Sequence, residues 1–446
     1  MKRKTSILLA LLLAFVMVLS ACGPKEGDVK EPGKEAGEGE KTALTGQITV
    51  QTESGWLDFY KMVAEKLVKE NPDAKIEFVE TGSFDHLDVI KTTSAENKDV
   101  ADLFSVPADR LEDLTRNDVL AAIPAKEMAD KIGGFENFDE GLGGIFKVED
   151  NYFAFPYNIE TLVTFVNKKN AEDLGIDSSK PFEMTEQKDE ATVLLPIFDA
   201  WFGVAPNNAV GIDLLARKDG KFSSTYTKAY ADLEADQKAV FDGLYEYWKM
   251  HDQAVTPLFD PEAGWGYLDE EFTTGGKGVI RLGGPWELGG FIEKAGQENL
   301  EVYPIGHITV AGKPLAHWQG GWGLAVNSRI EEDQEKMALA QAYIEALMNP
   351  ENAVELFKAT GKIMPNVGVD VYEKSDLSDL EKKTIKNVFE SFEVSVPRPT
   401  YPEYGSVWDT WKNSVLSWAS KKPASPEDAY KELNAAFTSM MEQLAQ

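Results

Sequence analysis

The chain contains one cysteine, Cys22, and this cysteine closes an N-terminal segment of the kind that directs export. The segment has a basic start at residues 2–4 and then an apolar run of 13 residues, from Ile7 to Leu19. A secretory signal has this layout, with an apolar core of about 7–15 residues and small residues at the cut. The run is too short for a membrane-spanning helix, which needs about 20 apolar residues. The sequence therefore predicts an exported protein that folds without disulfide bonds and depends on its hydrophobic core.

The residues at the predicted cut, Leu-Ser-Ala-Cys at 19–22, resemble a bacterial lipobox, in which the cysteine is acylated and becomes the first residue of the mature protein. This resemblance predicts a signal peptide over residues 1–21 and a lipid anchor on Cys22, which holds the protein on the outer face of the cell membrane. The alternative is an ordinary signal peptide with an incidental cysteine. Residues 22–45 are rich in Gly, Glu, Lys and Pro, and we expect them to form a flexible tether.

The chain is strongly acidic, with a formal net charge of −30. Removal of the signal peptide would make the charge more negative by three, because residues 2–4 are all basic. An acidic surface argues against nucleic acid as a partner and against electrostatic docking on anionic lipid. The histidines are scattered and form no His-x-x-x-His pair, so we expect neither a zinc site nor another metal or cofactor. They are His86, His251, His307 and His317.

Strand and helix patterns alternate along the chain, which predicts βαβ units and an α/β fold. A body of about 400 residues is also large enough to divide into two domains. The expected strands are 46–50, 75–78 and 100–106, and the expected helices include 56–67, 335–348 and the segment after residue 426.

No motif requires an enzyme. The glycine pairs are not followed by Gly-Lys-Ser/Thr, and there is no Gly-x-Ser-x-Gly nucleophile elbow. Acidic runs such as 269–271 are ordinary solvated faces in a chain with 75 acidic residues. We therefore expect a protein that binds and does not catalyse.

Three segments share one design, a buried strand that ends in a polar or aromatic group. They are 103–110, 279–286 and 152–160, the last continuing to residue 168. Ligands of open α/β sheets collect at the carboxyl ends of strands, which is where these groups are placed.

At these residues the chain resembles the extracellular solute-binding proteins of ABC importers, in particular the maltose- and oligosaccharide-binding branch. The matching motifs follow the same order over residues 46–446. They are Ala-Asp-Arg (108–110), Ala-Phe-Pro-Tyr-Asn-Ile-Glu-Thr-Leu (154–162) with Asn167-Lys168, Gly-Gly-Pro-Trp (283–286), Gly-Gly-Trp-Gly-Leu-Ala-Val-Asn (320–327) and the aromatic run to Trp408.

The resemblance implies a two-lobed periplasmic-binding-protein-like fold, with two α/β domains, three hinge crossings and a ligand in the cleft. We expect the crossings near 157–158, 304–305 and 349–350. The N-terminal lobe is then 46–157 plus 306–349, and the C-terminal lobe is 158–305 plus 350–446. Such proteins close on their ligand by hinge motion. The implied protein is a monomer that delivers its ligand to the transmembrane permease subunits of an ABC transporter.

The implied ligand is a carbohydrate, an oligosaccharide above all. Trp286 and Trp408 match stacking tryptophans of the family, and Asp109, Arg110 and Glu160 match its hydroxyl-binding residues. Trp322, Trp56 and Trp265 are further candidates. Each has a structural alternative: packing for the tryptophans, a helix N-cap for Asp109 and a hinge salt bridge for Glu160. Trp411 and Trp418 are predicted core residues because they lie on one helical stripe with Trp408.

The sequence departs from a maltodextrin binder in three places: the polar stretch 177–191, the segment 194–201 in place of an aromatic subsite, and the loop 52–56, which lacks an Asp-Lys pair. These departures argue against maltodextrin specificity and leave the general sugar prediction unchanged. The main alternative ligand is a polyamine, whose site would need clustered acids among aromatic residues, and this composition could supply them. A ferric ion or an anion would be another, although the close pair Tyr245 and Tyr247 lies on a predicted helix. A surface glycan hydrolase is the third alternative.

Overall fold

The computed structural model describes residues 43–187 and 189–445, which form one compact unit. The predicted signal peptide, the lipid anchor at Cys22 and nearly all of the predicted tether lie outside the described residues. Within the described part of the chain, no helix is long and apolar enough to cross a membrane.

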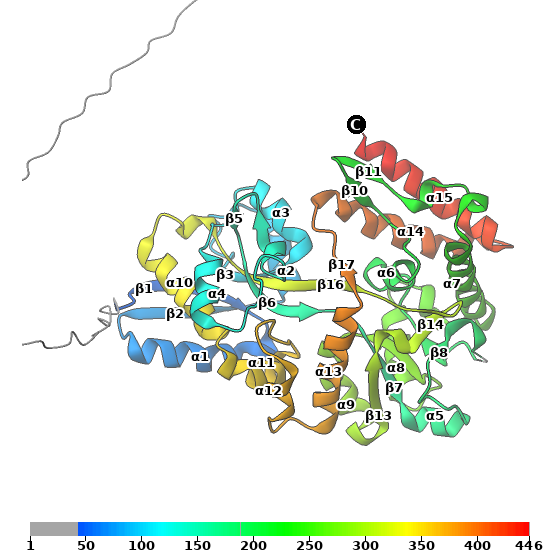
Figure 1. Cartoon of the computed structure of the whole chain (residues 1–446), viewed down its shortest axis with the longest axis horizontal. Coiled ribbons are helices and arrows are strands. Elements are labelled where there is room, and N and C mark those ends of the chain that lie inside the picture. Colours follow the sequence, from blue (N-terminus) through cyan, green and yellow to red (C-terminus); the bar gives the residue numbers. More distant parts are fainter. Residues whose placement is uncertain (1–42, 188, 446) are drawn as a thin grey trace, which may run out of the picture. The chain divides into compact units, whose positions relative to one another are not determined.

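The first sheet combines segments that are far apart in the sequence (Figure 1). Its strands follow the order β17-β16-β3-β1-β2, and β6 also pairs with β16. Strands β1, β2 and β3 are parallel, whereas β16 runs antiparallel to β3 and β6. Every residue of β3 is buried, as expected for a strand that is covered on both faces. The bounds are β1 (Gly46–Thr52), β2 (Ala74–Glu80), β3 (Leu103–Pro107), β6 (Phe155–Glu160), β16 (Trp318–Val326) and β17 (Val396–Pro397).

Helices cover this sheet and confirm the predicted alternation of strands and helices. Helix α1 contacts β2 and α10, helix α10 contacts β1, and helices α2 and α3 contact β3. The buried hydroxyl of Tyr60 on α1 donates a hydrogen bond to the Tyr157 hydroxyl on β6 at 3.0 Å, which ties the helix to the far edge of the sheet. The bounds are α1 (Leu57–Glu70), α2 (Ser83–Thr92), α3 (Ala108–Arg116), α10 (Gln334–Leu347) and α11 (Ala353–Thr360).

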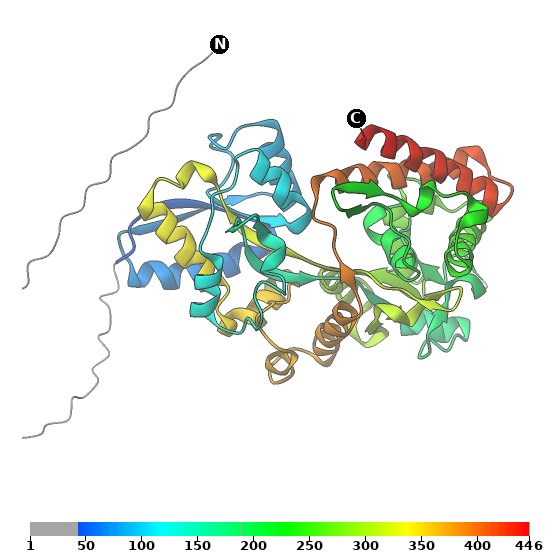
Figure 2. The ribbon, with the colours of Figure 1, turned by 45° about the horizontal axis from the view of Figure 1, so that its top comes forward.

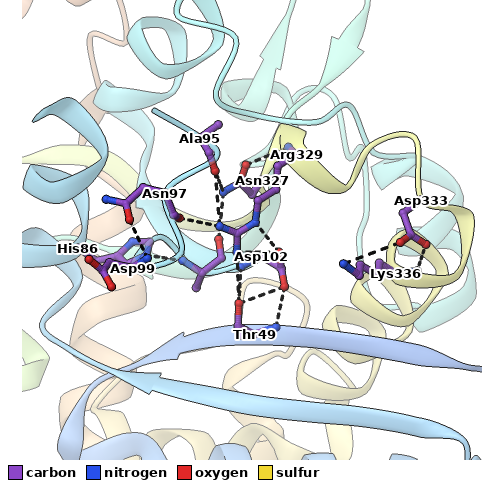
Figure 3. A network of polar contacts seen from close by, with 11 residues as sticks. Thr49, His86, Ala95, Asn97, Asp99, Asp102, Asn327, Arg329, Asp333 and Lys336 are labelled. Carbon is purple, nitrogen blue, oxygen red and sulfur yellow. Dashed lines mark hydrogen bonds and ion pairs between the residues drawn. The ribbon is translucent and has the colours of Figure 1, made fainter. Parts of the chain in front are cut away.

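A polar network fixes the start of β3 against β1 and the end of β16 (Figure 3). Asp102 accepts from the backbone N–H of Thr49 at 2.8 Å and pairs with Arg329 at 2.7 Å. Arg329 also donates to the carbonyl of Asn97 at 2.7 Å. The prediction that a strand starts at residue 100 was therefore wrong by three residues, because the segment 95–102 is a loop held by these side chains.

A second sheet has the order β13-β7-β12-β9. Helices α5, α9 and α13 contact β13, and α8 contacts β12. A small third sheet has the strand order β15-β14-β8, and β14 and β15 follow β13 directly in the chain. The bounds are β7 (Val163–Asn167), β8 (Phe182–Glu183), β9 (Val193–Leu194), β12 (Ile280–Gly283), β13 (Leu300–Pro304), β14 (Ile308–Val310), β15 (Lys313–Pro314), α5 (Lys168–Leu174), α8 (Gly264–Thr273), α9 (Leu288–Ala295) and α13 (Asp379–Glu393).

The C-terminal helices α14 and α15, coloured orange to red, lie side by side in Figure 2 and contact α6 and α7. Trp411 and Trp418 on α14 are each 1% exposed, which confirms the prediction that they belong to the core. The indole of Trp418 contacts Phe241 and Trp248 of α7 edge-on. The bounds are α6 (Ala200–Asn208), α7 (Ala235–Ala254), α14 (Gly405–Lys421) and α15 (Pro426–Leu444), with α4 (Ala125–Ile132), α12 (Val369–Glu373) and the hairpins β4 (Lys147–Val148)–β5 (Asn151–Tyr152) and β10 (Ala216–Lys218)–β11 (Lys221–Ser223) completing the fold.

Up to α13 the chain passes between the two large sheets three times, and β17 then returns to β16 of the first sheet. The first passage is the short link between β6 and β7. The second leads from the end of β13 through β14 and β15, which belong to the third sheet, to β16 of the first sheet. The third lies between α11, which contacts α1, and α13, which contacts β13. The crossings expected near 157–158, 304–305 and 349–350, and the lobe bounds that follow from them, stay predictions.

Candidate ligand-binding site

One cavity of about 1060 Å³ gathers all eight residues that the sequence suggested as ligand contacts. Elements of both large sheets contribute to its wall, and so do the segments on which the three predicted motifs end. The eight residues are Trp56, Asp109, Arg110, Glu160, Trp265, Trp286, Trp322 and Trp408.

A buried arginine holds the two predicted hydroxyl-binding carboxylates together. Arg398, just after β17, donates to Glu160 at 2.7 Å and to Asp109 at 2.9 Å, and its side chain is only 6% exposed. Asp109 lies within the first turn of α3 and caps no N–H group, so its alternative role as an N-cap is wrong. The alternative role of Glu160 in a salt bridge is confirmed, while Glu160 also lines the cavity.

Arg398 offsets part of the negative charge of Asp109 and Glu160 and leaves some of their oxygen lone pairs free to accept hydrogen bonds. Burial works against the charge of Arg398, but Asp109 and Glu160 outweigh it and raise its pKa above the usual value. Glu160 also accepts from the indole N–H of Trp322 at 2.9 Å. Each carboxylate oxygen has two lone pairs, so both groups can still accept from a ligand hydroxyl.

Trp286 presents its ring on a tight turn directly after β12. It is 43% exposed, an unusual amount for so large an apolar side chain. A Cβ atom at Gly284 would lie 2.2 Å from the indole, so only glycine leaves room for the ring there. The Glu287 carboxylate accepts from the Gly284 N–H at 2.8 Å and from Arg281 at 2.9 Å, which fixes the turn.

Further aromatic rings extend from Trp286 along the same wall. The ring centres of Trp201 and Trp286 are 5.6 Å apart, and those of Phe202 and Trp265 are 5.4 Å apart. Trp265 is 36% exposed. Asp199 caps α6 by accepting from the Trp201 N–H at 2.8 Å, and this places both rings at the cavity. Segment 194–201 therefore does supply an aromatic residue, and Trp201 and Phe202 were missed. The Asp before an apolar helix start was the available signal.

Trp408 lies in the first turns of α14 and is half-buried. Its ring contacts Trp318 at 5.9 Å and Tyr404 at 5.5 Å, both edge-on. These contacts hold one side of the indole while the other borders the cavity. Six of the chain's ten tryptophans line this one space.

A lysine that sequence reasoning missed lies among three aromatic rings. Lys362 Nζ is 4.9 Å from the ring centre of Trp56, 5.2 Å from that of Trp322 and 5.5 Å from that of Tyr157. We refer to Trp56, Tyr157 and Trp322 as the Lys362 cage. Since Trp322 is only 6% exposed and the lysine lies over its ring, this tryptophan offers a ligand little free surface.

The charges around the cavity are nearly balanced, in contrast to the acidic chain. Six lining residues are acidic and five are basic, although acids outnumber bases 75 to 45 in the chain. Among the described residues, no group of three or more His, Cys, Asp or Glu side chains is placed to hold a metal ion. The arrangement offers aromatic faces, charged hydrogen-bonding groups and a space of drug-sized or larger volume.

One family model matches more than half of the chain. The family model described as bacterial extracellular solute-binding protein matches residues 54–354. The curated phosphate-binding protein PstS of Bacillus subtilis is 35% identical over 83 residues, but the match spans only 27% of that protein and 19% of this chain.

Solved structures match over nearly the whole described body. The maltose-binding protein MalE of Listeria monocytogenes, in complex with maltose, has a TM-score of 0.66 at 20% identity, over 89% of this chain and 98% of that one. MalX of Streptococcus pneumoniae, in complex with maltopentaose, has a TM-score of 0.68 at 18% identity, over 89% and 100%. The GacH receptor of Streptomyces glaucescens has a TM-score of 0.65 at 18% identity, over 90% and 99%. At these identities the likeness concerns the two-lobed fold.

Proposed function

Because this chain belongs to the family of bacterial extracellular solute-binding proteins, we propose that it is the substrate-binding component of an ABC importer that captures an oligosaccharide outside the cell. The observation that carries the proposal is the set of tryptophans around one cavity that also holds ion-paired carboxylates. A pyranose has an apolar C–H face that packs on an aromatic ring, and hydroxyls that bind to charged groups.

In this proposal Trp286 and Trp265 are the main stacking platforms, because their rings are the most exposed of the lining tryptophans. Trp201 and Trp408 extend the platform on either side. Asp109 and Glu160, held by Arg398, accept from ligand hydroxyls, and Arg110 donates to ring or hydroxyl oxygens. No step in this scheme breaks a covalent bond, and the role is binding without turnover.

We propose that the two lobes meet at the three passages between the sheets. The N-terminal lobe is then built on the first sheet and the C-terminal lobe on the second, with links at 160–163, 315–318 and 361–379. Ligand binding would draw the lobes together by rotation at these links. Removal of water from the cavity would strengthen each polar contact to the sugar.

We propose that the mature protein is a monomer anchored at the outer face of the membrane by a lipid on Cys22, and that it delivers its ligand to permease subunits. The lipobox-like residues 19–22 and the family support this placement. Growth of cells with radioactive palmitate tests the anchor, since the label should enter the wild-type protein but not the Cys22→Ser variant.

A titration tests the oligosaccharide proposal. The tryptophan fluorescence of the full-length protein in detergent is followed against neutral and acidic oligosaccharides and spermidine. We expect a saturable change with at least one oligosaccharide, and an affinity about tenfold or more weaker in Trp286→Ala, as for a buried aromatic anchor. Leu174→Ala removes an apolar side chain of similar exposure outside the cavity and should leave the affinity unchanged.

A response to spermidine alone would instead support a polyamine, and the absence of any response to sugars would count against the proposal. The site itself favours the sugar. A polyamine site needs free carboxylates, but Asp109 and Glu160 are already paired with Arg398, and five basic residues line the same cavity.

A further inference from the structure

Lys362 is the one half-buried lysine in the wall of the described cavity, and it has no carboxylate partner. In the described part of the chain, no carboxylate oxygen lies within 4.0 Å of its Nζ atom, and its ammonium donates no hydrogen bond. Lys412 and Lys91 also line the cavity, but both are exposed to water. Arg398, by contrast, has two carboxylate partners.

The surroundings of Lys362 disfavour the charged form of its ammonium. Burial lowers the pKa of its ammonium, and the more distant Glu160 and Glu53 offset only part of this effect. The cation–π contacts of the cage offset part of this effect, because ring faces attract a cation. None of these contacts satisfies the three N–H donors of the ammonium, which prefer oxygen acceptors.

The loop that carries Lys362 is pressed against the turn that carries the most exposed tryptophan. A Cβ atom at Gly361 would lie 2.9 Å from the Cα of Trp286, and φ of Gly361 is +68°, so glycine is required on both counts. Trp286 and Lys362 also line the same cavity, so one oligosaccharide of several rings can contact both. The nearest acids, Glu160 and Glu53, already accept hydrogen bonds from Trp322, Arg398 and Ser83.

We propose, as a refinement that depends on the oligosaccharide function proposed above, that the ligand is an acidic oligosaccharide with a uronate-type carboxylate placed against Lys362. The carboxylate supplies the oxygen acceptors that the ammonium lacks. Arg110 is a second donor in the same cavity: its side chain is 32% exposed, and its Nε atom lies 3.9 Å from the Asp109 carboxylate, too far for a hydrogen bond. Pairing in a partly desolvated site makes such a charge-assisted contact stronger than it is in water.

A pair of ligands that differ only in charge tests the proposal. Trigalacturonate carries a carboxylate on each ring, and its methyl ester keeps the rings but removes the charges. Titration calorimetry on the full-length protein in detergent should give an affinity about tenfold or more higher for trigalacturonate than for the ester, as for a desolvated charge pair. Maltotriose, a neutral sugar of the same length, completes the panel.

The variant Lys362→Met keeps an apolar stem in the cage but removes the ammonium. It should weaken the binding of trigalacturonate by about tenfold or more relative to that of the ester, which abolishes the preference, and Lys362→Arg should keep the preference. Lys358→Met is the matched control, since Lys358 lies on α11 outside the cavity and pairs with Glu355 and Asp376. It should behave as the wild type.

The outcomes separate this refinement from the function on which it rests. If maltotriose or the ester binds as tightly as trigalacturonate, or if Lys362→Met weakens acidic and neutral ligands by the same factor, the acidic ligand is refuted and the oligosaccharide function stands. If none of the three binds, and neutral and acidic sugars also fail in the fluorescence titration, both are refuted.

Discussion

At the scale of single residues, the site depends on Arg398, which carries no motif of its own in the sequence. It joins Asp109, next to the end of β3, to Glu160, at the end of β6, although the three residues are far apart in the chain. The carboxylates could be predicted because each follows a buried strand. Their partner could not, because nothing local distinguishes an arginine in an extended loop from a solvated one.

We expect Arg398→Met to lower the free energy of unfolding by about 3–5 kcal/mol, since it leaves two carboxylates nearly buried without their cation. Urea unfolding measures this loss. Arg116→Met is the control, because that side chain is 52% exposed in its pair with Glu112, and such a pair contributes about 0–1 kcal/mol. The triple variant with Asp109→Asn and Glu160→Gln should recover part of the stability. A cost below that of the control would contradict the role of Arg398.

Lys362 was missed for a related reason. A lone lysine after a helix is usually solvated, and its cage comes from three separate segments, η1 (Ser54–Trp56), β6 and β16. Trp286, in contrast, was predicted to face a ligand because two glycines and a proline precede it and force a turn.

At the scale of elements, the long regular parts of the fold were predictable and the short strands were not. Strand β1 and helices α1, α10 and α15 have clear periodicity, and the predictions for them are confirmed within a few residues. The short strands β14 and β15 carry too few residues for a pattern, and only their pairing with β8 shows to which sheet they belong.

Strand β16 approaches β6 closely at Gly321. A Cβ atom there would lie 2.5 Å from the backbone oxygen of Asn158, and a backbone atom cannot turn away as a side chain can. We expect Gly321→Ala to destabilise the protein by about 1–3 kcal/mol through this overpacking. Gly289→Ala on α9 meets nothing within 4 Å and should stabilise by about 0.4–1 kcal/mol. Thermal unfolding of both variants, followed by circular dichroism, should show shifts of opposite sign.

At the scale of the whole molecule, three buried histidines predict a loss of stability in mild acid. Burial lowers the pKa of His86 to about 4 and those of His251 and His317 to about 3. The folded protein therefore keeps them neutral, whereas the unfolded chain protonates them below about pH 6.5. Their contribution to stability is complete above that pH and is lost as the pH falls toward the folded values.

By pH 5 each histidine should have cost about 2 kcal/mol, from the gap to the unfolded pKa. Asp199, Asp213 and Glu287 oppose the trend, because burial raises their pKa values. Urea unfolding at pH 7 and pH 5 measures the net loss. His251→Gln should reduce that loss by about 2 kcal/mol relative to the wild type, since the opposing carboxylates are unchanged. An equal loss in both proteins would show that His251 is not kept neutral.

In the terms of host–guest chemistry, the Lys362 cage is a host that is covalently tethered to its own guest. Three aromatic faces around a cation are the arrangement that proteins use to capture free ammonium ligands. Here the position is filled by a lysine whose linker keeps its local concentration high, so a free amine would have to compete with an intramolecular rival. We therefore expect the same side chain to compete with organic cations and to remain available to an anion.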